Sequence, residues 1–239
     1  MRPFACALCA LCLLFLFLGG AFSGFERVAL DPGVYDRLQA ELDIYDEAGL
    51  APEAQSRVNA VMAGYLSGRL DSLDTQEEVF GVYQEVFNED EKAHMVDVLN
   101  LFRLERALKA AVLLSGLTLM IVLPFLLRRE TGRILLTGAA ILTGLIALIA
   151  LFAVLLWTTN GFDALFIRFH HIFFSNDLWL MDPRTDAMIR MLPSDFFLRI
   201  AAESGLSALV HATLLTVGGA LFMPAAGSLI TRIGRKHTK

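Results

Sequence analysis

Four long stretches without a charged residue dominate the hydrophobic pattern of this chain of 239 residues. They are Pro3–Phe25, Ala110–Leu127, Ile134–Phe162 and Ser204–Thr231. A helix that crosses a membrane needs about 20 mostly apolar residues, and each stretch is close to that length or exceeds it. The pattern therefore predicts a polytopic membrane protein with four transmembrane helices.

The first of these stretches has two interpretations. Arg2, the apolar run Phe4–Leu18 and the small residues of Gly20–Ser23 also match a cleaved signal peptide. We favour a retained helix, because three further spans follow and make this stretch a natural first transmembrane helix. In either case, the residues that follow it are exported.

The composition agrees with this prediction. Hydrophobic residues make up 56% of the chain and charged residues 19%, and the mean hydropathy is +0.57. A typical soluble protein has about 45–50% apolar and about 25% charged residues. This balance argues against a soluble enzyme, a disordered chain and a protein that binds nucleic acid.

Charge is unevenly distributed among the segments between the spans, although the whole chain has a net charge of −5. Arg2, the loop 128–133 and the tail 232–239 together carry eight basic residues and one acidic residue. The segment 26–106 carries 18 acidic and 7 basic residues, and the segment 163–203 carries 6 and 4. Because basic loops remain in the cytoplasm, both termini are predicted to be cytoplasmic and both long loops to lie on the outer side of the membrane.

The predicted fold is therefore an all-α, polytopic membrane protein with a helical extracellular cap. Transmembrane helices are expected at 3–25, 107–127, 134–160 and 204–231, with the cap at 26–106, a cytoplasmic loop at 128–133, an extracellular or interfacial aromatic loop at 161–203, and a cytoplasmic tail at 232–239.

Capping patterns predict the helices of the cap. Helices are expected to begin at Asp31-Pro32, at Pro52, at Thr75 and at Asn88. At each position a cap residue, a helix-initiating proline or a capping box precedes apolar residues at helical spacing. Nothing interrupts the pattern after Asn88, so the last of these helices is expected to continue into the second span. A further short helix is expected to begin near Ser194 and lead towards the last span.

Several classes of active site are missing from the sequence. The only cysteines, Cys6, Cys9 and Cys12, fall within the first span, so the exported loops have neither a disulfide nor a cysteine nucleophile. The chain contains no H-E-x-x-H zinc motif, no G-x-S-x-G nucleophile elbow and no glycine-rich phosphate loop. What remains is imidazole and carboxylate chemistry, which suits a reaction whose substrate brings its own nucleophile.

His94 is the most informative histidine. It shares a predicted helix face with Asp97, Glu91 and Asp90, and a neighbouring carboxylate can orient an imidazole that acts as a general base. The alternative interpretation is a solvated acidic helix face. His170 and His171 lie in the aromatic loop and could supply a second imidazole, whereas His211 in the last span is a weaker candidate.

The aromatic loop, 162–179, combines phenylalanine, tryptophan and histidine with few charges. Aromatic side chains gather at the membrane–water interface, so they could form a floor for acyl chains or simply an anchoring belt.

Three motifs resemble those of one family. They are Asn88–Val98 (NEDEKAHMVDV), Phe169–Trp179 (FHHIFFSNDLW) and Leu192–Phe197 (LPSDFF). The chain resembles the bacterial integral-membrane family that includes the lipoprotein intramolecular transacylase. The resemblance covers nearly the whole chain and implies four spans with a histidine motif in each outer loop.

The resemblance implies an acyl-transfer activity, for which we expect neither a cofactor nor a metal. The sn-2 acyl chain of a diacylglyceryl lipoprotein would move to the α-amine of that molecule's own N-terminal cysteine, giving a lyso-lipoprotein. The two family histidines correspond to His94 and His170, with His171 an alternative for the second, and Asp97 would orient His94. Residues expected to bind the lipid substrate are His171, Phe169, Phe173, Phe174, Asn176 and Trp179.

Two other functions remain open on the sequence alone. One is a non-catalytic membrane sensor or assembly subunit whose cap binds a partner. The other is a metal-dependent membrane hydrolase that uses His94, Asp97, His170 and Asp177. The sequence does not reveal which lipoproteins are substrates, the acyl-chain preference, the oligomeric state or the regulation.

Overall fold

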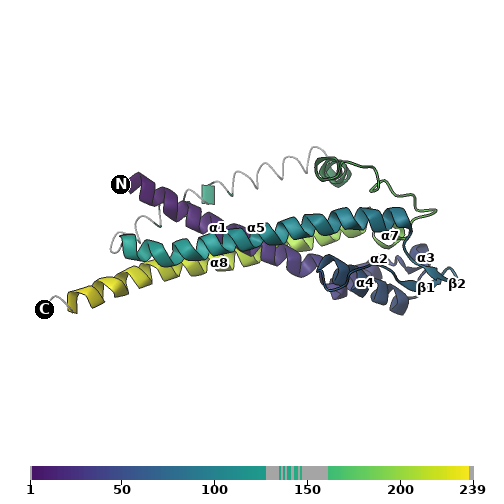
Figure 1. Cartoon of the computed structure of the whole chain (residues 1–239), viewed down its shortest axis with the longest axis horizontal. Helices are drawn as coiled ribbons and strands as arrows, with labels where there is room; N and C mark the ends of the chain where they lie inside the picture. The colour runs from purple at the N-terminus through teal and green to yellow at the C-terminus, as the bar shows by residue number, and fades with distance from the viewer. Residues whose placement is uncertain are drawn as a thin grey trace. The chain divides into compact units, whose positions relative to one another are not determined.

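The computed structural model describes residues 2–127 and 161–236, together with residues 135, 137, 139, 140, 143, 144 and 146 (Figure 1). The predicted third span, 134–160, therefore lies mostly outside the described residues, and the basic loop 128–133 lies wholly outside them.

The described residues belong to two compact units. Unit 1 comprises the described parts of Met1–Gly24, Arg106–Thr159 and Leu206–Lys239, and unit 2 comprises Phe25–Glu105 with the described part of Asn160–Gly205. The apolar stretches of the sequence build the first unit, and the acidic and aromatic segments build the second.

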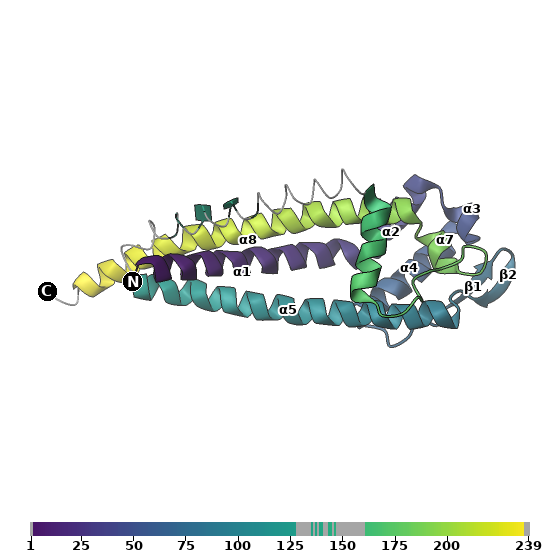
Figure 2. The same cartoon turned by 90° about the horizontal axis from the view of Figure 1, so that it is seen from above.

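Parts of three long helices lie side by side in unit 1 (Figure 1 and Figure 2). They belong to α1 (Arg2–Ala29), α5 (Glu89–Leu127) and α8 (Ser194–Lys236). Gly20 allows a close approach, because a Cβ atom there would lie 2.6 Å from the backbone of Ala212. Small residues of this kind let helices pack closely within a membrane.

These three helices are long and apolar enough to cross a membrane, over Phe4–Ala29, Glu89–Leu127 and Ser194–Ile233. The first, second and fourth predicted spans fall within them. The short helix expected at Ser194 is instead the beginning of α8, which continues without a break to Lys236.

Unit 2 contains short helices, a hairpin and the adjoining ends of the long helices. Its short elements are α2 (Pro32–Leu42), α3 (Tyr45–Ala48), α4 (Pro52–Leu66), β1 (Gln76–Val79), β2 (Val82–Glu85) and α7 (Ala187–Met191). Their apolar side chains form one core, in which Phe87, Met191 and Phe196 are among the most deeply buried.

The predicted helix at Thr75 is wrong, because this segment forms a β-hairpin, although the described residues are mostly helical, as predicted. β1 and β2 pair antiparallel from Gln76↔Glu85 to Val79↔Val82. The turn residues Phe80 and Gly81 both have positive φ angles, 50° and 81°. Two consecutive left-handed residues match the twist of a two-residue hairpin and are incompatible with a right-handed helix.

A buried polar network fixes α7 against the other short helices. Gln39 of α2 exchanges side-chain hydrogen bonds with Asn59 of α4, and its Nε2 also donates to the carbonyl oxygen of Met191 at 3.0 Å. Gln39 and Asn59 are completely buried. Each of these bonds offsets the desolvation of an amide and thereby fixes the position of α7 in unit 2.

Candidate active site

The start of α5 is held by a capping box. Asn88 Oδ1 accepts from the backbone N–H of Glu91 at 2.9 Å, and Glu91 Oε2 accepts from the N–H of Asn88 at 2.8 Å. The cap predicted at Asn88 is therefore confirmed, and it sets the register of the helix turns that carry His94 and Asp97.

Glu91 also links α5 to α7 through a hydrogen bond. Its second oxygen, Oε1, accepts from the backbone N–H of Met188 at 2.6 Å, and the residue is only 1% exposed. Burial raises the pKa of Glu91, while the two backbone hydrogen bonds oppose this shift. Glu91 is therefore not part of a solvated acidic face, whereas Asp90 is exposed.

His94 is buried near the polar start of α5, before the expected span 107–127. It is 6% exposed, and its ring packs against the edge of Phe174 with a centroid distance of 5.1 Å. Burial and, to a smaller extent, the nearby His170 lower the pKa of His94 to about 4, while Asp97 opposes the shift. Within the described residues, Nδ1 of His94 is buried without a hydrogen-bond partner.

His170 comes from a helix over residues 161–173, which runs across the direction of α5 in Figure 2. The planes of the His170 and His94 rings make an angle of 28°, and the two ring centroids are 6.1 Å apart. Its Nδ1 lies 2.7 Å from the carbonyl oxygen of Phe166. Because a carbonyl oxygen can only accept, Nδ1 carries the hydrogen, and Nε2 is the nitrogen left for chemistry.

The structure distinguishes the two adjacent histidines. His170 is 7% exposed and lies beside His94, whereas His171 is exposed and contacts the edge of Trp179 at 5.1 Å. Trp179 also lies 4.8 Å from His170, so it contacts both rings. The geometry thus pairs His170, and not His171, with His94.

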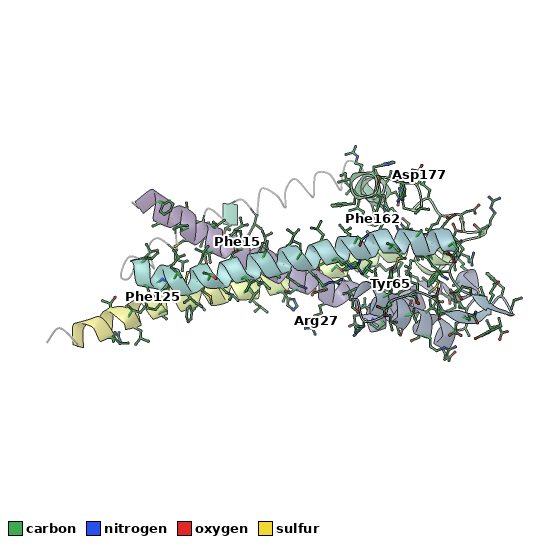
Figure 3. All side chains as sticks on the ribbon, in the orientation of Figure 1. Phe15, Arg27, Tyr65, Phe125, Phe162 and Asp177 are labelled. Carbon is green, nitrogen blue, oxygen red and sulfur yellow. The ribbon has the colours of Figure 1, made fainter. Side chains whose placement is uncertain are left out.

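Aromatic rings surround the histidine pair. The centroids of Phe166, Phe174 and Phe169 lie 4.2, 5.4 and 5.5 Å from that of His170. Burial in these surroundings lowers the pKa of His170 as well. Figure 3 marks Phe162 and Asp177, which lie near the two ends of this aromatic segment. Both histidines are consequently uncharged at neutral pH, which is the form in which an imidazole can accept a proton.

Asp97 contacts the other histidine-bearing segment. Its Oδ2 accepts from the side-chain amide of Asn176 at 2.8 Å. The expected role of Asp97, to orient His94, has no hydrogen bond to support it here, because Nδ1 of His94 has no partner among the described residues. The carboxylate acts on His94 through its charge alone.

A cavity of about 270 Å³ lies beside the pair. It is lined by Asp97, Asn100, Leu101, Leu104, Phe173, Phe174, Ser175 and Asn176. Sequence analysis missed Asn100 and Ser175, although Asn100 is one turn beyond Asp97 on the same helix face. The cavity is polar near Asp97 and apolar near Leu104, which suits an amphipathic ligand.

Among the described residues, no group of three or more His, Cys, Asp or Glu side chains has the geometry of a metal site. Asp177, a ligand in the hydrolase alternative, is exposed. His211 belongs to unit 1, where its Nδ1 lies 2.8 Å from the carbonyl oxygen of Ser207.

Comparison with known proteins identifies the family. The family model described as lipoprotein intramolecular transacylase Lit matches residues 8–197. The chain belongs to the Lit family. This family membership favours an enzyme over a non-catalytic subunit: the protein is an acyltransferase of bacterial membranes that acts on lipoproteins.

Solved structures of the Lit transacylase from Bacillus cereus have the same fold. One is 25% identical, covers 100% of this chain and 99% of that chain, and superposes with a TM-score of 0.68. Two variants with one histidine replaced by arginine or by alanine are 23% and 24% identical, with TM-scores of 0.63 and 0.64. Each of the two matches covers 99% of this chain, and they cover 95% and 96% of the respective variant chains. No curated protein sequence matches the chain.

Proposed function

We propose that this Lit protein moves the sn-2 acyl chain of a diacylglyceryl lipoprotein to the α-amine of the same molecule's N-terminal cysteine. The product is a lyso-lipoprotein that is N-acylated and keeps one acyl chain on its glyceryl group. The observation that supports this proposal most strongly is the pair of buried imidazoles, His94 and His170, 6.1 Å apart in a site enclosed by aromatic rings.

The reaction needs a base and an acid but no further reactant. The amine nitrogen attacks the ester carbonyl carbon, and the tetrahedral intermediate loses a proton from nitrogen. The bond from that carbon to the sn-2 oxygen then breaks, and the oxygen takes up a proton. One proton leaves nitrogen and one reaches oxygen, so two adjacent imidazoles balance the reaction.

We assign His94 as the base and His170 as the acid partner. A depressed pKa keeps His94 neutral and able to accept a proton at neutral pH. The bond from His170 Nδ1 to Phe166 leaves its Nε2 without a hydrogen, so Nε2 would take up the proton that His94 removes from the amine and pass it to the leaving alkoxide. Phe174 contacts both rings and excludes water from the space around them.

The tethering of amine and ester in one head group supplies much of the rate. Well-oriented intramolecular reactions reach effective molarities of about 10⁵–10⁸ M, so no activated enzyme nucleophile is needed. Cys9 and Cys12 are buried in unit 1, where Cys12 Sγ donates to the carbonyl oxygen of Gly116. Transfer without an acyl-enzyme is consistent with this placement.

The proposal includes the arrangement across the membrane. The charge pattern of the sequence supports cytoplasmic termini, and the acidic segments of unit 2 would then carry the active site on the outer surface. The substrate would enter from the outer leaflet. The exposed side chains of Phe169, Ile172 and Phe173 would contact its acyl chains or the membrane lipids.

The test is conversion of a single diacylglyceryl lipopeptide by the purified protein in detergent, without added phospholipid. Because transfer is an isomerisation, the mass is unchanged, and the readout is loss of the free amine together with an N-acyl fragment in tandem mass spectrometry. We expect complete conversion. A requirement for phospholipid as acyl donor would reject the proposal.

A further inference from the structure

The cavity beside the histidine pair contains one charged side chain, the carboxylate of Asp97, among its lining residues. Asn100, Ser175 and Asn176 supply its other polar groups, and no lysine or arginine of the described part of the chain lines it. Among the described residues, Asp97 is therefore the charged group that a ligand in this cavity would contact, while the guanidinium of Arg103 donates to Oδ1 of Asn100 at 3.1 Å.

The carboxylate of Asp97 keeps hydrogen-bonding capacity for a ligand. Its Oδ2 accepts from Asn176, whose own Oδ1 accepts from the backbone N–H of Leu178 at 3.2 Å. Within the described residues, Oδ1 of Asp97 accepts no hydrogen bond, and no basic side chain pairs with it. Asp97 is half-buried, so Oδ1 can accept a hydrogen bond from a cationic ligand in the cavity.

We propose that Asp97 binds the α-ammonium group of the substrate's N-terminal cysteine. This inference rests on the proposed function, which places that amine beside His94. An α-amine has a pKa of about 8 and is mostly protonated at neutral pH, so it must enter a partly dehydrated site as a cation. Asp97 supplies the opposite charge, and the hydroxyl oxygen of Ser175 can accept from one of the remaining N–H groups, whereas Oδ1 of Asn100 already accepts from Arg103 at 3.1 Å.

The position of the cavity fits the step that follows. His94 lies one turn before Asp97 on the same face of α5, and Phe174 both lines the cavity and contacts the His94 ring. The bound ammonium releases one proton to solvent, and the neutral amine then attacks the ester as described above. Asp97 is thus a substrate-binding group rather than the orienter of His94, which it does not contact by a hydrogen bond.

Binding of unreactive analogues tests the inference without chemistry. Two lipopeptides with ether-linked chains in place of the esters would be compared, one with the α-amine and one with a hydroxyl group in its place. We expect the wild-type protein to bind the amine analogue about ten to a hundred times more tightly, the range for a hydrogen bond to a charged group.

Asp97→Asn should abolish this preference, because asparagine has the same shape and can still accept from Asn176 but carries no charge. Asp90→Asn is the matched control, since it removes a charge from an exposed position of the same helix and should keep the preference. A preference that survives in Asp97→Asn, or an equal loss of affinity for both analogues, would overturn the inference.

The same preparations separate this inference from the proposed function. Wild-type protein that converts the ester substrate but shows no preference for the amine analogue would contradict the ammonium site alone. Protein that prefers the amine analogue but transfers acyl chains only from added phospholipid would contradict the proposed function and leave the ammonium site supported.

Discussion

The rings of His94 and His170 are nearly parallel, with centroids 6.1 Å apart, although the two residues come from different helices of unit 2. At this distance the charge on one imidazolium opposes protonation of the other. The pair therefore holds at most one extra proton near neutral pH. Acyl transfer needs no more than this, because one proton is taken from the amine and one is returned to the alkoxide.

The depressed pKa of His94 predicts an acid-sensitive fold. The pKa is about 6.5 in the unfolded chain and about 4 in the folded protein, so the unfolded state binds more protons between these values. Stability in detergent should be full above about pH 6.5 and fall as the pH is lowered towards about 4. His94→Gln should flatten this decline in thermal unfolding curves, and an unchanged slope would contradict the burial of His94.

Replacement of either buried histidine should abolish transfer. His94→Ala and His170→Ala should each lower the rate by about 10²-fold or more, because each removes a proton-transfer group. Loss of the free amine of a lipopeptide measures this rate. His171→Ala is the matched control, since this exposed side chain lies outside the pair, and its rate should stay within a few-fold of wild type. Full activity of both single variants, His94→Ala and His170→Ala, would refute the mechanism.

Glu91 should matter for stability rather than for proton transfer. Glu91→Ala leaves the buried backbone N–H of Met188 and the partly buried N–H of Asn88 without their acceptor, which should cost about 2 kcal/mol or more. Asp90→Ala, at an exposed neighbouring position, should change stability by less than about 0.5 kcal/mol. Thermal unfolding in detergent measures both variants, and equal effects would show that Glu91 is not the link between α5 and α7.

The arrangement across the membrane is tested by labelling single cysteines in a variant with Cys6, Cys9 and Cys12 replaced by alanine. An impermeant reagent should reach cysteines placed at Ser72 and Ser194, both of which are exposed in unit 2. Cysteines at Thr131 and Thr238 should react only after the cells are opened. Labelling at Thr131 in intact cells would contradict the proposed orientation.

Local sequence signals predicted much of unit 2 correctly, because caps act over a few residues. Pro52 and Asn88 begin helices as expected, and the latter helix continues to Leu127. The hairpin was missed because the capping-box pattern from Thr75 to Glu78 also suits a strand that alternates between faces. The positive φ angles at Phe80 and Gly81 decide between the two structures, and Phe80 also contacts Gly49, which is remote in sequence, through its ring and its backbone N–H.

The candidate site could be predicted only in part, because its contacts join residues far apart in sequence. Adjacent residues of a helix differ in direction by about 100°, so spacing alone could not decide whether His170 or His171 faces His94. The partner of Glu91 is equally remote, since Met188 lies on a separate short helix. Helical spacing placed Asp97 beside His94 correctly but could not reveal that Asn176 occupies one of its oxygens.

The central claim is that acyl transfer takes place within one lipoprotein molecule, and a crossover measurement tests it most directly. One lipopeptide would carry deuterated acyl chains on an ordinary cysteine, and the other ordinary chains on a heavy-isotope cysteine. The purified protein would convert the mixture, and tandem mass spectrometry would identify the acyl chain on each amine. The account predicts that every N-acyl chain keeps the label of its own molecule. Deuterated chains on heavy-isotope cysteines would contradict it.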